Sequence, residues 1–166
     1  MPFKDPFIDL LQVGDTEFEL AAPETYVGKT DTFIVPKGEG TDLASVPIGL
    51  TWLIPRYGRY TRAAILHDYL WSHPELISKS DADGVFRRVL RELGVSALRR
   101  WTMWAAVRLA SILKHHGASG TPLKHWLSLL VLWPTLIAFV AIPTVVVYVF
   151  TFLYKLAEWA LSPFDS

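Results

Sequence analysis

The stretch that decides the fold is Ala63-Ala64-Ile65-Leu66-His67-Asp68-Tyr69-Leu70-Trp71, a short apolar segment with a histidine and a carboxylate side by side at its centre. Apolar residues fill most of its positions, which predicts a helix with a broad buried face. A titratable imidazole inside such a segment makes it the first candidate in the chain for a site of chemistry.

Two more helices are predicted after this one. The first helix begins at Thr61 as its N-cap and ends near Ser72, because Pro74 cannot continue it. The second helix begins at Ser80-Asp81-Ala82-Asp83 and is closed by Gly94, and its apolar residues recur at helical spacing. The third helix, at about residues 97 to 115, is apolar over most of its circumference yet carries Arg99, Arg100, Arg108 and Lys114.

The residues before these helices favour short strands. Thr16-Glu17-Phe18-Glu19-Leu20 alternates polar and apolar residues, and Asp31-Thr32-Phe33-Ile34-Val35 is rich in β-branched and aromatic residues. About two to three strands of this kind need a helix to pack on. The predicted fold class is therefore α+β: a small N-terminal antiparallel β meander packed on a mainly helical domain, plus a C-terminal transmembrane helix.

Charge is sorted along the chain although the net charge is zero. Residues 1 to 55 carry 3 Lys/Arg and 9 Asp/Glu, whereas residues 84 to 124 carry 8 Lys/Arg and a single acid, Glu92. The chain has no cysteine, which excludes disulfides and thiolate metal sites. Any metal ion would be held by carboxylates, imidazoles, backbone carbonyls and water.

A long hydrophobic run follows a flexible break. Residues 126 to 154 form 29 consecutive positions without a charge, more than the ~20 needed to cross a bilayer. The predicted division is a domain at 1–116, a linker at 117–124, a membrane-spanning segment at 125–161 and a tail at 162–166. Pro134 and Pro143 would kink one tilted span, and a re-entrant hairpin is the alternative. The basic flank predicts that the N-terminal domain lies on the cytoplasmic side.

The side chains of His67 and Asp68 point about 100° apart on a helix, so we expect them to have different roles in the site. His67 can act as a general base if Asp83 from the second helix orients its other nitrogen. Asp68 can then bind a hard cation or position substrate, and Asp42 is a candidate second ligand.

Structural interpretations stay open beside this one. His67 can be a core histidine, Asp42 and Ser45 can bond to backbone in a turn, and Asp83 can belong to a capping box with Ser80. His73 lies before a proline, and its role is expected to be structural. No Gly-x-Ser-x-Gly motif and no Gly-rich phosphate loop occurs in the sequence.

Three ordered motifs resemble a domain-of-unknown-function family of tailed phages and prophages over about residues 16 to 110. They are Thr41-Asp42-Leu43-Ala44-Ser45-Val46-Pro47, Ala63-Ala64-Ile65-Leu66-His67-Asp68-Tyr69-Leu70, and Ala82-Asp83-x-x-Phe86. The resemblance implies a phage or prophage origin and supplies no activity.

The last two motifs are also similar to the two-helix core of phospholipase A2, particularly the viral capsid type. That resemblance implies that His67 activates water, that Asp68 binds calcium and that Asp83 holds the histidine. The Gly-rich calcium loop of that family is missing here, so residues 41 to 47 would have to replace it.

Two functions remain in view at this point. One is a membrane-anchored phage hydrolase acting on phospholipid or another cell-envelope component, with a divalent cation, calcium first, as cofactor. The other is a non-enzymatic phage membrane or virion protein that binds a phage or envelope protein. In both, the lipid bilayer is a partner and no nucleic acid is expected.

Overall fold

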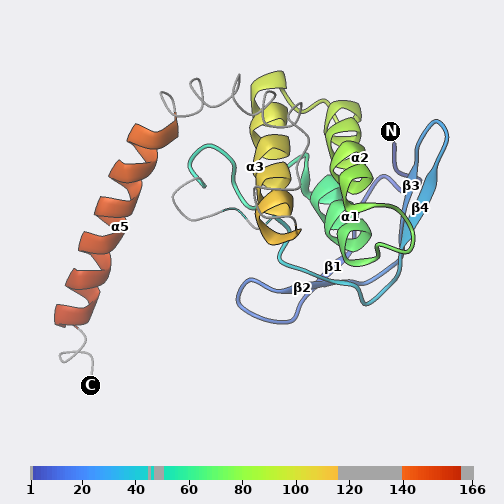
Figure 1. Cartoon of the computed structure of the whole chain (residues 1–166). Helices are drawn as coiled ribbons and strands as arrows, with labels where there is room; N and C mark the ends of the chain where they lie inside the picture. Colours follow the sequence, from blue (N-terminus) through green and yellow to red (C-terminus); the bar gives the residue numbers. More distant parts are fainter. Residues whose placement is uncertain (1, 45, 47–50, 116–139, 162–166) are drawn as a thin grey trace.

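The computed structural model describes residues 2–44, 46, 51–115 and 140–161. Five short strands come first along the chain and helices follow, so the α+β class is confirmed (Figure 1). The strands are β1 (Leu10–Gln12), β2 (Phe18–Leu20), β3 (Glu24–Val27), β4 (Thr32–Val35) and β5 (Gly40–Thr41). The helices are α1 (Thr61–Ser72), α2 (Lys79–Glu92), α3 (Ala97–His115) and α5 (Ile142–Leu161).

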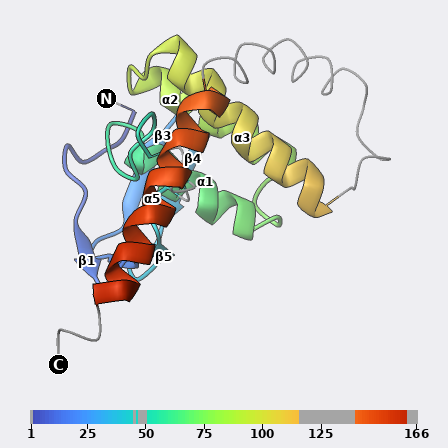
Figure 2. The same cartoon turned by 90° about the vertical axis from the view of Figure 1, so that its left-hand side faces the viewer.

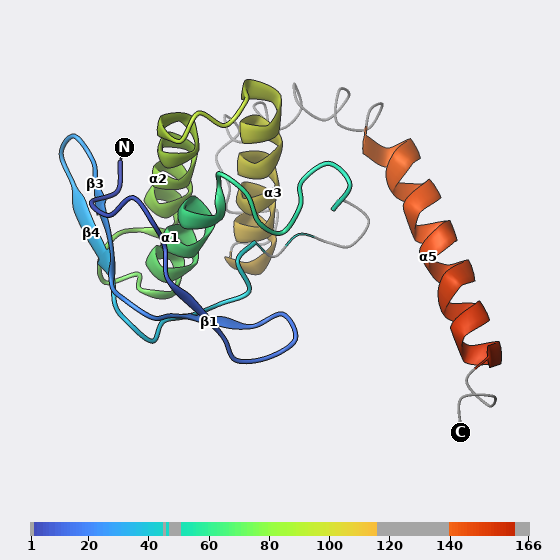
Figure 3. The ribbon, with the colours of Figure 1, turned by 180° about the vertical axis from the view of Figure 1, so that it is seen from behind.

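The strands form two small antiparallel sheets rather than one meander. One sheet has the order β1-β2-β5, and the other is the β3-β4 hairpin, in which Glu24 pairs with Val35. The expected strands near residues 16–20 and 31–35 correspond to β2 and β4. β3 and β4 lie beside α1 and α2 (Figures 1 and 3), and the Arg62–Glu24 ion pair joins α1 to β3.

The helix boundaries follow the predicted punctuation, but two caps differ. α1 ends at Ser72 and α2 at Glu92, just before Gly94 with its φ of +72°. Thr61 is not the cap of α1: it is the first helical residue, and its hydroxyl accepts a hydrogen bond from the Gly58 amide. The cap of α2 is Ser78 rather than Ser80, and its side chain accepts from the Asp81 amide.

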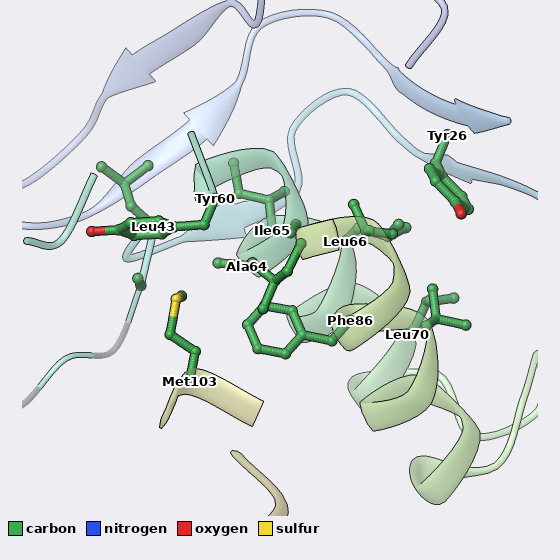
Figure 4. Close-up of a cluster of buried hydrophobic side chains, with 14 of the residues drawn as sticks. Tyr26, Leu43, Tyr60, Ala64, Ile65, Leu66, Leu70, Phe86 and Met103 are labelled. Carbon is green, nitrogen blue, oxygen red and sulfur yellow. The ribbon is translucent and has the colours of Figure 1, made fainter. Parts of the chain in front are cut away.

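The three helices of the domain stand side by side, with α2 packed against both α1 and α3 (Figures 1, 2 and 3). Their facing sides close one apolar core, which α1 dominates because most of its residues are buried. Figure 4 shows side chains of this core from all three helices and from the strands and loops: Tyr26, Leu43, Tyr60, Ala64, Ile65, Leu66, Leu70, Phe86 and Met103.

α5 stands apart from these helices (Figures 1 and 3), and none of its side chains is buried. Its 20 residues have a mean hydropathy of 1.4, so it is long and apolar enough to cross a membrane. Pro143 is the second residue of α5, and residues 140 and 141 directly before the helix have π-helical backbone. The other part of the predicted run, residues 126 to 139, and Pro134 with it, lies outside the described residues.

Candidate functional site

His67 lies on the buried side of α1, two turns into the helix. Its neighbours Leu66 and Leu70 belong to the core, and only 7% of the residue is exposed. On the next helix, the Phe86 ring lies 5.0 Å from the imidazole, centroid to centroid. The apolar face of the helix thus carries the imidazole into the space between α1 and α2.

Asp83 meets His67 from α2, as its predicted role of orienting the imidazole requires. Nε2 of His67 lies 2.9 Å from Oδ1 of Asp83, and Asp83 is only 1% exposed. A buried carboxylate needs donors to replace its hydration. The imidazole Nε2–H is one such donor, and this contact fixes the orientation of the ring.

The second donor is Arg108 of α3, which the sequence reasoning missed as a partner. Its Nη1 donates to Oδ2 of Asp83 over 3.1 Å, and its side chain is 11% exposed. One signal was available: Arg108 interrupts an otherwise apolar stretch, and a cation in that setting needs an acid. His67, Asp83 and Arg108 therefore link α1, α2 and α3 through a single carboxylate.

Asp68 lies on the opposite side of the imidazole and reaches solvent. Its Oδ1 is 3.5 Å from Nδ1 of His67, longer than an ordinary hydrogen bond, and its side chain is 45% exposed. When His67 is neutral with its proton on Nε2, the lone pair of Nδ1 faces this half-exposed carboxylate. Nδ1 is therefore the ring nitrogen whose neighbouring carboxylate reaches solvent.

Three effects set the protonation of His67. Burial by itself lowers the pKa of the imidazole, but hydrogen bonds to Asp68 and Asp83 and their negative charges raise that pKa above its ordinary value. Of the two carboxylates, we assign the larger effect to Asp83, because its contact is shorter and shielded from water. With His67 protonated, two cations and two carboxylates balance in this cluster.

The predicted metal ligands, Asp68 and Asp42, do not complete a metal cluster in the described part of the chain. There, no group of three or more His, Asp or Glu side chains is arranged to hold an ion. Asp42 lies half-buried in the loop after β5, next to Leu43 with its φ of +69°. A calcium ion at Asp68 would need other oxygen ligands from backbone carbonyls, water or residues outside the described ranges.

The side chain of His73 contacts Tyr69, a residue in the last turn of α1. Its Nδ1 lies 2.8 Å from the carbonyl oxygen of Tyr69, and the His73 and Tyr69 rings lie 4.3 Å apart, centroid to centroid, tilted by 36°. The predicted turn residue Ser45 lies outside the described residues.

Comparison with known proteins matches the part of the chain that carries this site to one protein family. Residues 18–107 match a family model described as "Protein of unknown function (DUF1353)". The match covers β2 through the first half of α3 and includes three residues of the site, His67, Asp68 and Asp83, whereas Arg108 lies one residue beyond its end. No curated protein and no solved structure matches the chain.

Proposed function

We propose that this chain, which belongs to the DUF1353 family of proteins of unknown function, is a membrane-associated hydrolase in which His67 activates a water molecule. The substrate class that we favour is the carboxylic ester of a phospholipid, and another ester of the cell envelope is the alternative. The origin that we propose is a phage or prophage, with action during entry or lysis.

The observation that carries this proposal is the 2.9 Å contact between Nε2 of His67 and Oδ1 of Asp83. It holds the imidazole proton on the buried nitrogen and leaves the lone pair on Nδ1, beside the half-exposed Asp68. A histidine oriented by a buried carboxylate, with its other nitrogen toward the solvent side, is the arrangement that general-base catalysis requires.

The chemical step then follows from these atoms. Nδ1 takes a proton from water, and the water oxygen attacks the ester carbonyl carbon. Asp83 stabilises the imidazolium, which returns its proton to the leaving alkoxide as the carbon–oxygen bond breaks. The products are a fatty acid and a lysophospholipid, and Asp68 positions the substrate. If calcium takes part, Asp68 and Asp42 are the carboxylates that we propose would hold it, and it would polarise the ester carbonyl; no step depends on it.

The proposed location rests on α5. This helix is long and apolar enough to anchor the domain at a bilayer, and the basic segment before it favours the cytoplasmic side for the domain. An anchor of this kind would hold Nδ1 of His67 within reach of lipid.

The test uses the full-length protein with phosphatidylglycerol and phosphatidylethanolamine vesicles, in calcium and in EDTA, and measures released fatty acid. We expect His67→Gln to lower the rate by about 10²- to 10⁴-fold, the usual contribution of a general base. His73→Gln is the matched control, because the side chain of His73, which directly follows α1, has its described contacts with Tyr69. Its rate should match the wild type. The proposal is wrong if wild-type protein releases no fatty acid under either condition, or if folded His67→Gln keeps the wild-type rate.

A second function is favoured by one observation. His67 is only 7% exposed, and both ring nitrogens face carboxylates, which also suits a histidine that only links helices. In that case the protein is a non-enzymatic phage membrane or virion component that binds another phage or envelope protein. Absence of hydrolysis together with loss of folding in Asp83 variants would favour this function.

A further inference from the structure

We propose that a groove between α2 and α3 binds the phosphate of an anionic phospholipid headgroup. The groove has a volume of about 370 Å³ and is lined by Gly84, Arg87, Arg88, Arg91, Arg100 and Trp101. Four of these six residues are arginines, and none is acidic. The inference stands apart from hydrolysis at His67, because it concerns binding at a different surface.

The arginines of this groove have few acidic partners. Arg88 donates to Asp31 over 3.0 Å, whereas Arg87, Arg91 and Arg100 make no ion pair within the described part of the chain. Several guanidinium groups around one hollow repel each other, and an anion placed among them removes that repulsion. The planar fork of an arginine also matches two phosphate oxygens at once.

Two tryptophans of α3 hold one of these arginines in position. The guanidinium of Arg87 lies 5.0 Å from the ring centroid of Trp101 and 5.4 Å from that of Trp104. The two rings meet edge to face, 5.6 Å apart, and both are half-buried. Stacking restricts the side chain of Arg87, so less conformational entropy is lost when it binds an anion.

Gly84 keeps the groove open on the α2 side. A Cβ atom built at Gly84 would meet no other atom within 4 Å, so the space beside this residue is free. An alanine would favour the helix by about 0.5–1 kcal/mol at such a position. Gly84 therefore does not stabilise the helix, and its lack of a side chain leaves room for a ligand in the groove.

The apolar helix α5 favours a membrane lipid as the source of the phosphate group. α5 can cross a bilayer, and the connection from α3 to α5, residues 116 to 141, could span at most about 90 Å if fully extended. A basic groove tethered at that distance meets anionic headgroups at high local concentration. Tryptophans beside the arginines suit the same boundary, because their rings favour the headgroup region.

The experiment is isothermal titration calorimetry of the full-length protein in a neutral detergent. The ligand is dihexanoyl phosphatidylglycerol below its critical micelle concentration, and the comparison ligands are dihexanoyl phosphatidylcholine, inorganic phosphate and a 20-base-pair DNA duplex. The test variants are Arg87→Gln/Arg91→Gln, which removes two charges, and Gly84→Leu, which fills the groove without changing charge. The control Arg59→Gln/Arg99→Gln removes two charges from a separate hollow lined by Tyr57, Gly94 and Val95, among others.

We expect phosphatidylglycerol to bind, the first variant to weaken binding by about ten- to thirtyfold, and Gly84→Leu to weaken it similarly. The control should stay within about twofold of the wild type. The same order of affinities is expected when every protein also carries His67→Gln, which removes the proposed hydrolysis of the ligand and so separates this result from the fate of the hydrolase. Equal weakening by both arginine pairs would mean diffuse attraction and no groove site. Tighter binding of inorganic phosphate or of DNA, lost in the same variants, would overturn the lipid assignment, as would a lack of phosphatidylglycerol binding.

Discussion

Replacing Asp83 by asparagine tests the cluster that links the three helices. Both carboxylate oxygens accept hydrogen bonds, Oδ1 from His67 and Oδ2 from Arg108. Asparagine has nearly the same shape, but only one acceptor and a donating amide. The amide oxygen can still accept from Arg108, but the amide NH2 then faces Nε2 of His67, which can accept only if the imidazole is neutral with its proton on Nδ1. In either case the cation of Arg108 loses its buried counter-charge.

The expected loss follows from this geometry. A hydrogen bond to a charged group contributes about 1.5–3 kcal/mol, and removing one partner of a buried ion pair costs about 3–5 kcal/mol. Because Asp83 is 1% exposed and the side chain of Arg108 11% exposed, solvent cannot replace what is lost. We therefore expect Asp83→Asn to lower the free energy of unfolding by about 3 kcal/mol.

The assay is urea unfolding of the full-length protein in a mild neutral detergent, followed by the near-ultraviolet circular dichroism of its tryptophans. Asp81→Asn is the matched control, because Asp81 is an exposed carboxylate in the first turn of the same helix. It should lose no more than about 1 kcal/mol. If Asp83→Asn lost no more than this control at an unchanged urea dependence, the cluster would not hold the helices together.

Two more predictions concern pH and backbone conformation. Because the pKa of His67 is raised in the folded state, its charge stabilises the fold fully below about pH 6.5, and this contribution is lost as the pH rises through the raised pKa. The difference in unfolding free energy between wild type and His67→Gln should thus narrow from pH 5 to pH 9, and a constant difference would contradict the assignment. For the backbone, Gly84→Ala should raise the unfolding free energy by about 0.5–1 kcal/mol, whereas Gly38→Ala should lower it by about 1 kcal/mol. Neither new methyl group meets another atom within 4 Å, and only Gly38 has a positive φ, +81°, so urea midpoints that shift in the same direction would refute the reasoning.

Local sequence patterns predicted the helices well because helices are local structures. Apolar residues at helical spacing fixed α2, and Pro74 and Gly94 set the ends of α1 and α2. The caps were harder to predict, since Ser78 and Ser80 are both suitable and only the turn geometry selects Ser78. Of the strands, β2 and β4 were predicted from alternation and from β-branched and aromatic content, whereas the other strands, of two to four residues, carry too short a pattern. β3 is an example, because its Glu24 is buried against Arg62 rather than exposed.

The sequence by itself predicted that His67 would lie in an apolar helix and that Asp83 of the second helix would reach it, because helical spacing assigns each residue to a face. It also determined the apolar character of α5 and the basic character of α2 and α3. Only the tertiary structure decided that Arg108 shares the carboxylate of Asp83, and that arginines from two helices surround one groove. The physical reason is that such contacts join residues of different helices, so they depend on how the helices cross and not on the period of either one.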